Sequence, residues 1–177
     1  MKKGLPAWAT LALISLVAGL LLGFTNELTA PTIEEQNRIQ AEAARRSVLP
    51  QAEEFEEIQL AADSGLDSCY AGKAAGQIVG YVAQVTTRGY GGEIEVTTGV
   101  DLSGTIAGIS VGGANFSETM GLGSKAREPE FTDQFAGITA PVALGDNVDA
   151  ITSATITSAA VVSAVNIACD YIDTLQG

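Results

Sequence analysis

The chain has 177 residues, enough for one modest domain and an anchor, with a formal net charge of −12 at pH 7 and no histidine. The missing imidazole excludes Ser-His-Asp and Cys-His catalytic arrangements and the usual histidine metal sites, and two cysteines are too few to hold an iron–sulfur cluster alone. Any chemistry must therefore come from hydroxyls, carboxylates, backbone amides or a bound organic cofactor.

The first expected element is a membrane-spanning helix. Residues 7–24 read AWATLALISLVAGLLLGF without a charge. At ~1.5 Å per residue this helix is roughly 27 Å long, close to the ~30 Å hydrocarbon core of a bilayer. A cleavable signal peptide is the alternative, but its apolar region is usually only about 7–15 residues long. We therefore expect one uncleaved span within residues 1–25.

Charge predicts the orientation of this span in the cell (inner) membrane. Lys2 and Lys3 precede it, whereas Glu27, Glu34 and Glu35 follow it. Because positive charge stays inside, we expect a cytoplasmic N-terminus and an extracytoplasmic main domain. The exported part has seven basic and twenty-one acidic residues, a net charge near −14, which argues against nucleic-acid binding.

A connecting helix is expected over residues 26–50. Pro31 predicts a break, after which an uninterrupted helix-forming stretch reaches Ser47. The apolar stripe of this stretch is patchy, which favours a solvated helix that holds the domain off the membrane. A partner-binding helix is the alternative. Residues 51–177 are then left for a single folded domain.

The folded domain is predicted to be α+β, an antiparallel sheet covered by helices. Strands are expected at about residues 77–87, 92–100 and 104–112, with RGYGG and DLSG as hairpin turns and one or two further strands before them. From Thr155 onward the period changes to that of a helix. One apolar stripe follows spacings of 4, 3, 4 and 3 through Val161, Val165, Ala168, Ile172 and Leu175.

Hydroxyl groups gather just before this last helix, in DAITSATITS at residues 149–158. The backbone N–H groups of a first helical turn lack intrahelical partners, and the helix dipole favours negative charge, so Thr155 lies where a phosphate would bind. The simpler interpretation is a well-capped helix with Thr152 or Ser153 as the N-cap. A second polar loop, ETMGLG at residues 118–123, follows a strand; a turn leading into a short helix is its simpler interpretation.

Together, the single span, the connecting helix, RGYGGEIEVTTGVD, ETMGLG and the terminal DAITSAT resemble the FMN-binding domain family. Within it the chain resembles the G subunit of the Rnf electron-transport complex, with the C subunit of the sodium-translocating NADH:quinone reductase as the nearest relative. The family pattern Asp-x-x-Ser/Thr-Gly/Ser-Ala-Thr fits residues 149–155. The family often has glycine in place of Ser153 and proline in place of Met120.

The resemblance implies a flavoprotein in which Thr155 carries FMN through a phosphothreonine linkage, attached by a separate flavin transferase that uses FAD. Covalent attachment would keep a soluble cofactor from being lost outside the cell membrane, and a flavin needs no histidine for its redox chemistry. The expected cofactor-binding residues are Thr155 itself, its neighbours Asp149, Thr152, Ser153 and Ala154, and the loop residues Glu118, Thr119, Gly121 and Leu122.

The resemblance also implies an electron-relay subunit in a translocase that couples electron transfer between ferredoxin and NAD to Na⁺ or H⁺ translocation. Its partners would be other membrane, iron–sulfur and flavin subunits of the same complex. Two alternatives stay open: the C subunit of a sodium-translocating NADH:quinone reductase, and a cofactor-free, membrane-anchored binding or scaffold domain.

Cys69 and Cys169 both follow the span, on the side where disulfides can persist. The last helix should pack on the sheet, so a bridge between them is geometrically possible. Buried free cysteines are nevertheless common core residues. We expect two reduced thiols.

Overall fold

The structure is a computed structural model that describes residues 6–61 and 64–176. It contains two compact units, one reaching to Gln40 and one from Ala41 onward. Lys2 and Lys3, which carry the expected orientation of the span, lie outside the described residues.

Helix α1 (Ala7–Val48) begins the described chain and continues through Pro31. The predicted break at Pro31 is therefore wrong. A proline inside a helix costs ~3 kcal/mol, but the strong helix formers after it, among them Glu34, Glu35 and Gln36, continue the helix. An exposed ion pair between Arg38 and Glu35 lies in the same stretch.

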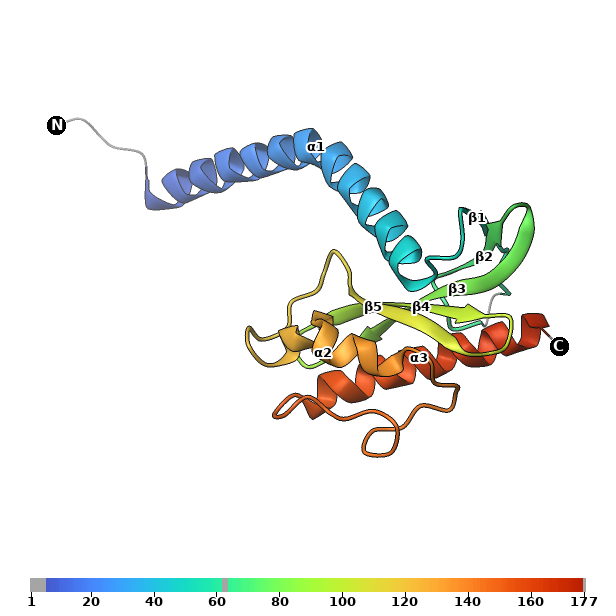
Figure 1. The fold of residues 1–177 in the computed structure, drawn as a ribbon. Helices are drawn as coiled ribbons and strands as arrows, with labels where there is room; N and C mark the ends of the chain where they lie inside the picture. Colours follow the sequence, from blue (N-terminus) through green and yellow to red (C-terminus); the bar gives the residue numbers. More distant parts are fainter. Residues whose placement is uncertain (1–5, 62–63, 177) are drawn as a thin grey trace. The chain divides into compact units, whose positions relative to one another are not determined.

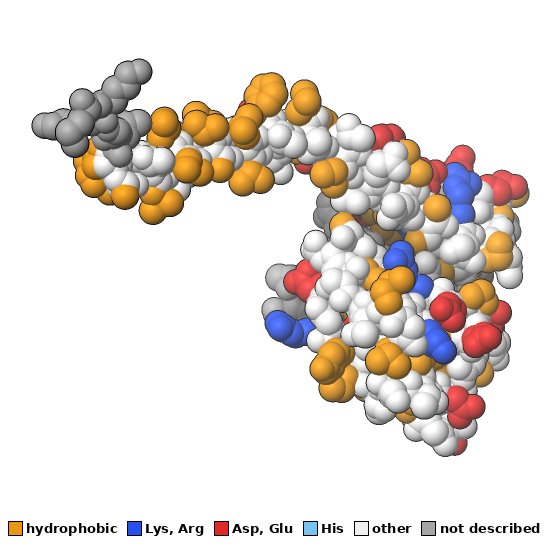
Figure 2. Space-filling model, turned by 90° about the vertical axis from the view of Figure 1, so that its left-hand side faces the viewer, with side chains coloured by type: hydrophobic (Ala, Val, Ile, Leu, Met, Phe, Trp, Pro, Cys, Tyr) orange, Lys and Arg blue, Asp and Glu red, His pale blue; other side chains and the backbone are white. Residues whose placement is uncertain are grey.

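The N-terminal part of α1 exposes large apolar side chains on all sides. Trp8, Leu11, Leu16 and Phe24 are between 60% and 75% exposed, and orange side chains cover this part of the helix in Figure 2. A helix that is apolar all round suits a lipid environment. Two described helices are long and apolar enough to cross a membrane, but in the second of them, at the C-terminus, 56% of the apolar window is buried inside the protein.

The second unit is built on one five-stranded antiparallel sheet in the simple order β1-β2-β3-β4-β5 (Figure 1). The strands are β1 (Glu54–Glu57), β2 (Ser68–Ala74), β3 (Gln77–Arg88), β4 (Glu93–Asp101) and β5 (Ile106–Gly112). The three expected strands and both hairpin turns are confirmed. In β4, Ile94 and Val96 are buried on one face, and Thr97 on the other face is also buried, because both sheet faces are covered there.

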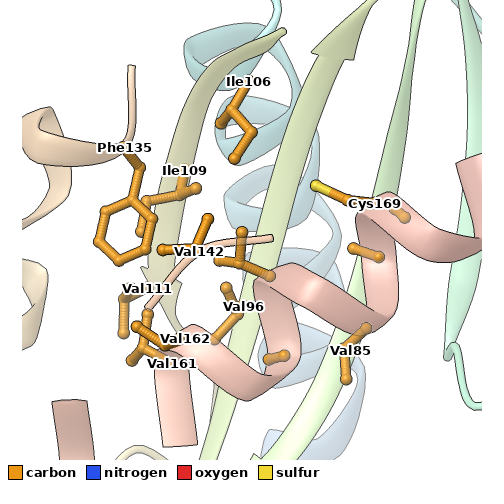
Figure 3. Close-up of a cluster of buried hydrophobic side chains, with 14 of the residues drawn as sticks. Val85, Val96, Ile106, Ile109, Val111, Phe135, Val142, Val161, Val162 and Cys169 are labelled. Carbon is orange, nitrogen blue, oxygen red and sulfur yellow. The ribbon is translucent and has the colours of Figure 1, made fainter. Parts of the chain in front are cut away.

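Helix α3 (Thr155–Gln176) covers one face of the sheet and packs mainly on β3 and β4 (Figure 1). Its predicted apolar stripe is confirmed, since Val161, Val165, Ala168 and Ile172 are buried and Leu175 packs beside them. Figure 3 shows the resulting core, in which side chains of the helix meet those of the strands, among them Val85, Val96, Ile109, Val111, Val161, Val162 and Cys169.

The opposite face of the sheet is covered by the chain that ends α1. Val48 and Leu49 form a small second core there with Ala52 and Val82. The close packing of Val48 on the sheet requires a glycine in β4, because a Cβ at Gly99 would collide with the backbone carbonyl oxygen of Val48. The sheet thus has helical cover on both faces, as the predicted α+β class requires.

Short elements join β5 to α3: the 3₁₀ helix η1 (Gly123–Arg127), α2 (Pro129–Thr132) and the 3₁₀ helix η2 (Asp133–Phe135). Phe131 and Phe135 anchor them in the core with an edge-to-face ring contact at 5.4 Å between centroids. Beyond them, the side-chain amide of Asn166 on α3 forms two hydrogen bonds with the backbone of Val142, at 2.8 and 2.9 Å. These contacts fix the segment that leads to the start of α3.

Both cysteines are buried and free, in agreement with the expected reduced thiols. Cys69 lies on β2 and Cys169 on α3, and both belong to the main core. Burial raises the pKa of the Cys69 thiol to about 11 and that of Cys169 to about 12, where the nearby charge of Asp170 adds to the effect. The two thiols are therefore core side chains and poor nucleophiles at neutral pH.

Candidate functional site

Thr155 is the first residue of α3 and its side chain is exposed. The backbone N–H of Ser158 donates to the carbonyl of Ala154 at 3.0 Å, so Ala154 occupies the position just before the helix. The N–H groups of such a first turn have no intrahelical acceptor. An exposed hydroxyl therefore lies among backbone donors, at the positive end of a 22-residue helix.

The predicted cap at Thr152 or Ser153 is wrong, because the helix begins later than either residue allows. A hydroxyl group from within the helix stabilises this turn by hydrogen bonds instead. The Ser158 Oγ accepts a hydrogen bond from the backbone N–H of Ile151 and donates one to the carbonyl of Ala154, both at 3.0 Å. The side chains of Thr152 and Ser153 are left exposed.

Ser153 adopts a left-handed backbone conformation, with φ of +64°. Such a conformation favours glycine, and a side chain there is strained by about 1–2 kcal/mol. The common glycine of the family thus has a structural reason at this position. Serine keeps the turn at some cost, and its small side chain leaves the approach to Thr155 open.

A pocket of about 420 Å³ opens beside Thr155. It brings the loop residues Glu118, Thr119 and Leu122 together with Ser153, Ala154 and Thr155, all of which are residues that the sequence predicts for the site. It is also lined by Thr157 and by three residues that the sequence did not assign to it: Tyr90, Gly123 and Ile156.

Three predicted site residues lie elsewhere. Asp149 and Thr152 line a separate hollow with Lys125, Glu128 and Gln134, and the backbone N–H of Asp149 donates to the Gln134 side chain at 2.7 Å. Gly121 lines neither hollow and instead shapes the loop at φ of +76°. The residues of the motif DAITSAT therefore lie in two places: Asp149 and Thr152 line the separate hollow, and the last three residues line the pocket.

Glu118 holds the loop to the hairpin turn between β3 and β4. It is 8% exposed, and its Oε1 accepts hydrogen bonds from the backbone N–H groups of Tyr90 at 2.8 Å and Gly91 at 3.2 Å. The hydroxyl of Ser117 adds a bond to the carbonyl of Gly91 at 3.1 Å. These bonds place the Tyr90 ring, which is 72% exposed, on the wall of the pocket.

The base of the loop is closed by a cation–π contact. The guanidinium of Arg127 lies 4.7 Å from the ring centroid of Phe116, so the residues before and after the loop are joined. The loop is therefore fixed at its base, at Glu118 and at Ser117, and its outer residues Met120 and Leu122 are exposed.

The residues of this pocket fit FMN. A phosphate ester needs a hydroxyl near N–H donors, which Thr155 and the first turn of α3 provide, and an isoalloxazine ring needs apolar walls, which Tyr90, Leu122 and Ile156 offer. Two buried polar atoms, Oε2 of Glu118 and Oγ1 of Thr157, have no hydrogen-bond partner within the described part of the chain. Residues 6–61 and 64–176 contain no group of acidic, cysteine or histidine side chains that could hold a metal ion.

Comparison with known families gives matches over two segments of the chain. Residues 9–48 match the RnfG N-terminal region, and residues 89–170 match the FMN-binding domain. The second segment contains the hairpin turn, the loop 118–123 and Thr155, which are the three parts of the pocket.

Curated relatives match over almost the whole chain. The G subunit of the Na⁺-translocating ferredoxin:NAD⁺ oxidoreductase complex of Acetobacterium woodii is 39% identical, over 94% of this chain and 90% of its own length. The G subunit of the ion-translocating oxidoreductase complex of Methanosarcina acetivorans is 37% identical, over 95% of this chain and 94% of its own.

Solved structures support the fold. The C subunit of the Na⁺-translocating NADH-quinone reductase of Parabacteroides distasonis superposes with a TM-score of 0.50 at 23% identity, over 62% of this chain and 63% of that one. The NqrC structure of Shewanella oneidensis also gives 0.50, at 18% identity, over 68% of this chain and 69% of that one. With its FMN-binding domain and the sequence similarity along its whole length, this chain belongs to the RnfG family, the G subunits of Rnf-type ion-translocating oxidoreductase complexes.

Proposed function

We propose that this chain is the membrane-anchored electron-relay subunit of such a complex and that it carries one FMN covalently on Thr155. Membership in the RnfG family supports the role of a redox subunit in a multi-subunit translocase. The observation that carries the attachment is the exposed Thr155 hydroxyl at the first residue of α3, facing a pocket that the FMN-binding domain match includes.

The residues of the chain supply binding and orientation. Thr155 Oγ holds the phosphate, the N–H groups of the first helical turn stabilise its negative charge, and Tyr90, Leu122 and Ile156 exclude water from the ring. When bound, FMN supplies one- or two-electron redox chemistry that no side chain of this protein provides. The protein therefore holds the cofactor in place, and it contributes no catalytic side chain.

Maturation requires a flavin transferase, and the second hollow is suited to contact it. Asp149 and Thr152 lie there, next to the attachment residue in sequence but outside the pocket. We assign these two residues to presentation of the turn to the transferase, and Ser153 and Ala154 to clearance for the flavin.

We further propose a topology with residues 1–25 as a single span, residues 26–50 as a connecting helix and residues 51–177 as an extracytoplasmic FMN-binding domain. The apolar part of α1 supports the span, and the positive charge before it supports a cytoplasmic N-terminus. Covalent attachment is then useful, because a flavin outside the cell membrane would otherwise be lost by dissociation.

An intact mass spectrum of the purified full-length chain tests the proposal. Co-expression with a flavin transferase should add the mass of FMN less one water, and the added mass should map to the peptide that contains Thr155. Expression without the transferase should give a colourless protein of unmodified mass. A colourless, unmodified product in both cases would favour the cofactor-free scaffold domain. Co-purification with quinone reductase subunits would instead favour the C subunit of that complex.

A further inference from the structure

Two buried oxygen atoms lie beneath the loop 118–123 without a hydrogen-bond partner in the described part of the chain: Oε2 of Glu118 and Oγ1 of Thr157. Thr157 is fully buried, and both residues line the pocket. Leaving a buried polar atom unpaired destabilises the folded state. Buried polar groups in proteins are nearly always paired, so two unpaired oxygens in one pocket call for a physical explanation.

Both oxygens lie close to Gly123. A Cβ at Gly123 would collide with Oε2 of Glu118 and would lie only 3.0 Å from Oγ1 of Thr157. Glycine at this position therefore lets the loop backbone lie directly over the pair.

The other carboxylate oxygen of Glu118 is already used. Oε1 accepts the backbone N–H groups of Tyr90 and Gly91 and so fixes the direction of the side chain. These two bonds hold the carboxylate in place, while its Oε2 stays unpaired near Thr157. A carboxylate oxygen can only accept a hydrogen bond, whereas a threonine hydroxyl can donate or accept. The pair is thus suited to a ligand that offers an N–H or O–H donor beside an oxygen atom.

We propose that Glu118 and Thr157 form a second, noncovalent anchor for the flavin that Thr155 holds. Oε2 of Glu118 accepts a hydrogen bond from an N–H or O–H of the cofactor, and the Thr157 hydroxyl bonds an oxygen of the same part. This inference rests on the proposed attachment of FMN. A flavin offers two such parts, the ring imide with its N–H between two carbonyls and the hydroxyls of the ribityl chain.

Anchoring at a second point has a consequence for electron transfer. A single ester bond leaves the ring free to rotate about the ribityl chain, and an electron relay works best when its donor and acceptor distances are fixed. Thr157 is two residues beyond the attachment residue on the same helix, and Glu118 comes from the loop. The second anchor would therefore fix the flavin against both walls of the pocket. Glu118 and Thr157 act as positioning residues.

The experiment compares the flavin-loaded and the flavin-free full-length chain in detergent, made with and without a flavin transferase. Thr157→Val is near-isosteric and removes the hydroxyl, and Thr157→Ser keeps it. We expect Thr157→Val to lower the Tm of the loaded protein by about 2–4 °C more than that of the flavin-free protein, the change that ~1 kcal/mol makes in a chain of this size. Thr157→Ser should show no such selective loss.

An equal change in Tm for loaded and flavin-free Thr157→Val protein would overturn the proposal, because the pair would then only hold the loop to the helix. If flavin-free Thr157→Val protein does not fold, Glu118→Gln gives the same comparison. The amide of glutamine keeps an oxygen for Tyr90 and Gly91 and places a donor where Oε2 accepts.

The midpoint potential of the attached flavin in Glu118→Gln then identifies the bound group. A shifted potential with a selective loss of Tm points to the ring imide, since its N–H cannot turn to accept. An unchanged potential with a selective loss of Tm in Thr157→Val points to the ribityl hydroxyls. An unchanged potential with no selective loss overturns the second anchor. A wild-type chain without added mass on the Thr155 peptide overturns the attachment as well, and the mass spectrum separates that failure from the others.

Discussion

The two ends of α3 differ in whether their nucleophilic side chains are accessible. At the N-terminal end, Thr155 is a weakly nucleophilic hydroxyl, but it is exposed beside a pocket and among backbone N–H donors. Toward the C-terminal end, Cys169 carries the more nucleophilic atom, but it is buried in the core with its pKa raised to about 12. Position on the helix, more than the intrinsic chemistry of the atom, therefore decides which side chain is available for modification.

The largest effect is expected at the N-terminal end. Thr155→Val should abolish covalent flavin, because the variant lacks the oxygen that forms the phosphoester, and it should leave the fold intact, because valine is near-isosteric and the side chain is exposed. Flavin fluorescence of the denatured protein measures attachment, and circular dichroism checks the fold. Thr174→Val, an exposed threonine at the C-terminal end of the same helix that lines neither hollow, is the matched control and should retain attached flavin. Flavin that survives denaturation of Thr155→Val would falsify the assignment.

The next largest effect concerns the thiols of Cys69 and Cys169, which lie in the main core and should be protected from alkylation. Because thiolates are the reactive form, pKa values of about 11 for Cys69 and about 12 for Cys169 imply alkylation at pH 8 at least about a hundredfold slower in the folded chain than after unfolding. Iodoacetamide labelling with and without urea, in the absence of reductant, measures this. Absence of labelled cysteine after unfolding would contradict reduced thiols and indicate a bridge.

The same thiols predict a loss of stability at alkaline pH. Their pKa values are raised in the folded state, so their contribution is complete below the unfolded pKa of about 9 and is lost as pH rises toward 11 and 12. The free energy of unfolding should therefore fall from about pH 9 upward. A Cys69→Ala, Cys169→Ala double variant, measured by urea unfolding from pH 7 to pH 11, should show a shallower fall.

The parts of the molecule that the sequence predicts well are those built on regular periods. Strand-forming runs bounded by turn sequences locate β3, β4 and β5 to within about two residues, and the 4, 3, 4, 3 spacing identifies the buried side of α3. The continuity of α1 through Pro31 was not predictable from that residue alone, because the cost of one proline is outweighed by its neighbours. The helix α2, with four residues, is too short for its period to be recognised.

The sequence motifs of the site were predictable, but the distribution of their residues over two hollows was not. Local sequence places Asp149, Thr152 and Thr155 within seven residues, and only the fold shows that the turn at Ser153 separates them into two hollows. Tyr90 was also missed as a pocket residue, because it lies in a hairpin turn. The signal for Tyr90 was an aromatic side chain between glycines, where a turn alone needs none.

A smaller effect is expected in the second hollow. Asp149→Asn should slow flavin attachment by about tenfold, as the loss of one charged hydrogen bond of ~1.5 kcal/mol to the transferase implies, with no change in Tm because the side chain is exposed. The rate at which purified, flavin-free chain gains the FMN mass with transferase and FAD measures this. Asp146→Asn, an exposed acid of the preceding turn that lines neither hollow, is the matched control. Equal rates for both variants would contradict a role for Asp149 in presentation.

The smallest effect concerns the turn that separates the two hollows. Ser153→Gly should raise the free energy of unfolding by about 0.5–1 kcal/mol, since the relief of left-handed strain at φ of +64° outweighs the added entropy of the unfolded chain. Ala75→Gly, at φ of +50° in the β2–β3 turn, is the matched control and should gain a similar amount. Urea unfolding of the flavin-free chain gives both values. If Ser153→Gly gains stability but attaches flavin more slowly, the serine contributes more than clearance, and the strain at the N-terminal end of α3 is retained for the attachment reaction itself.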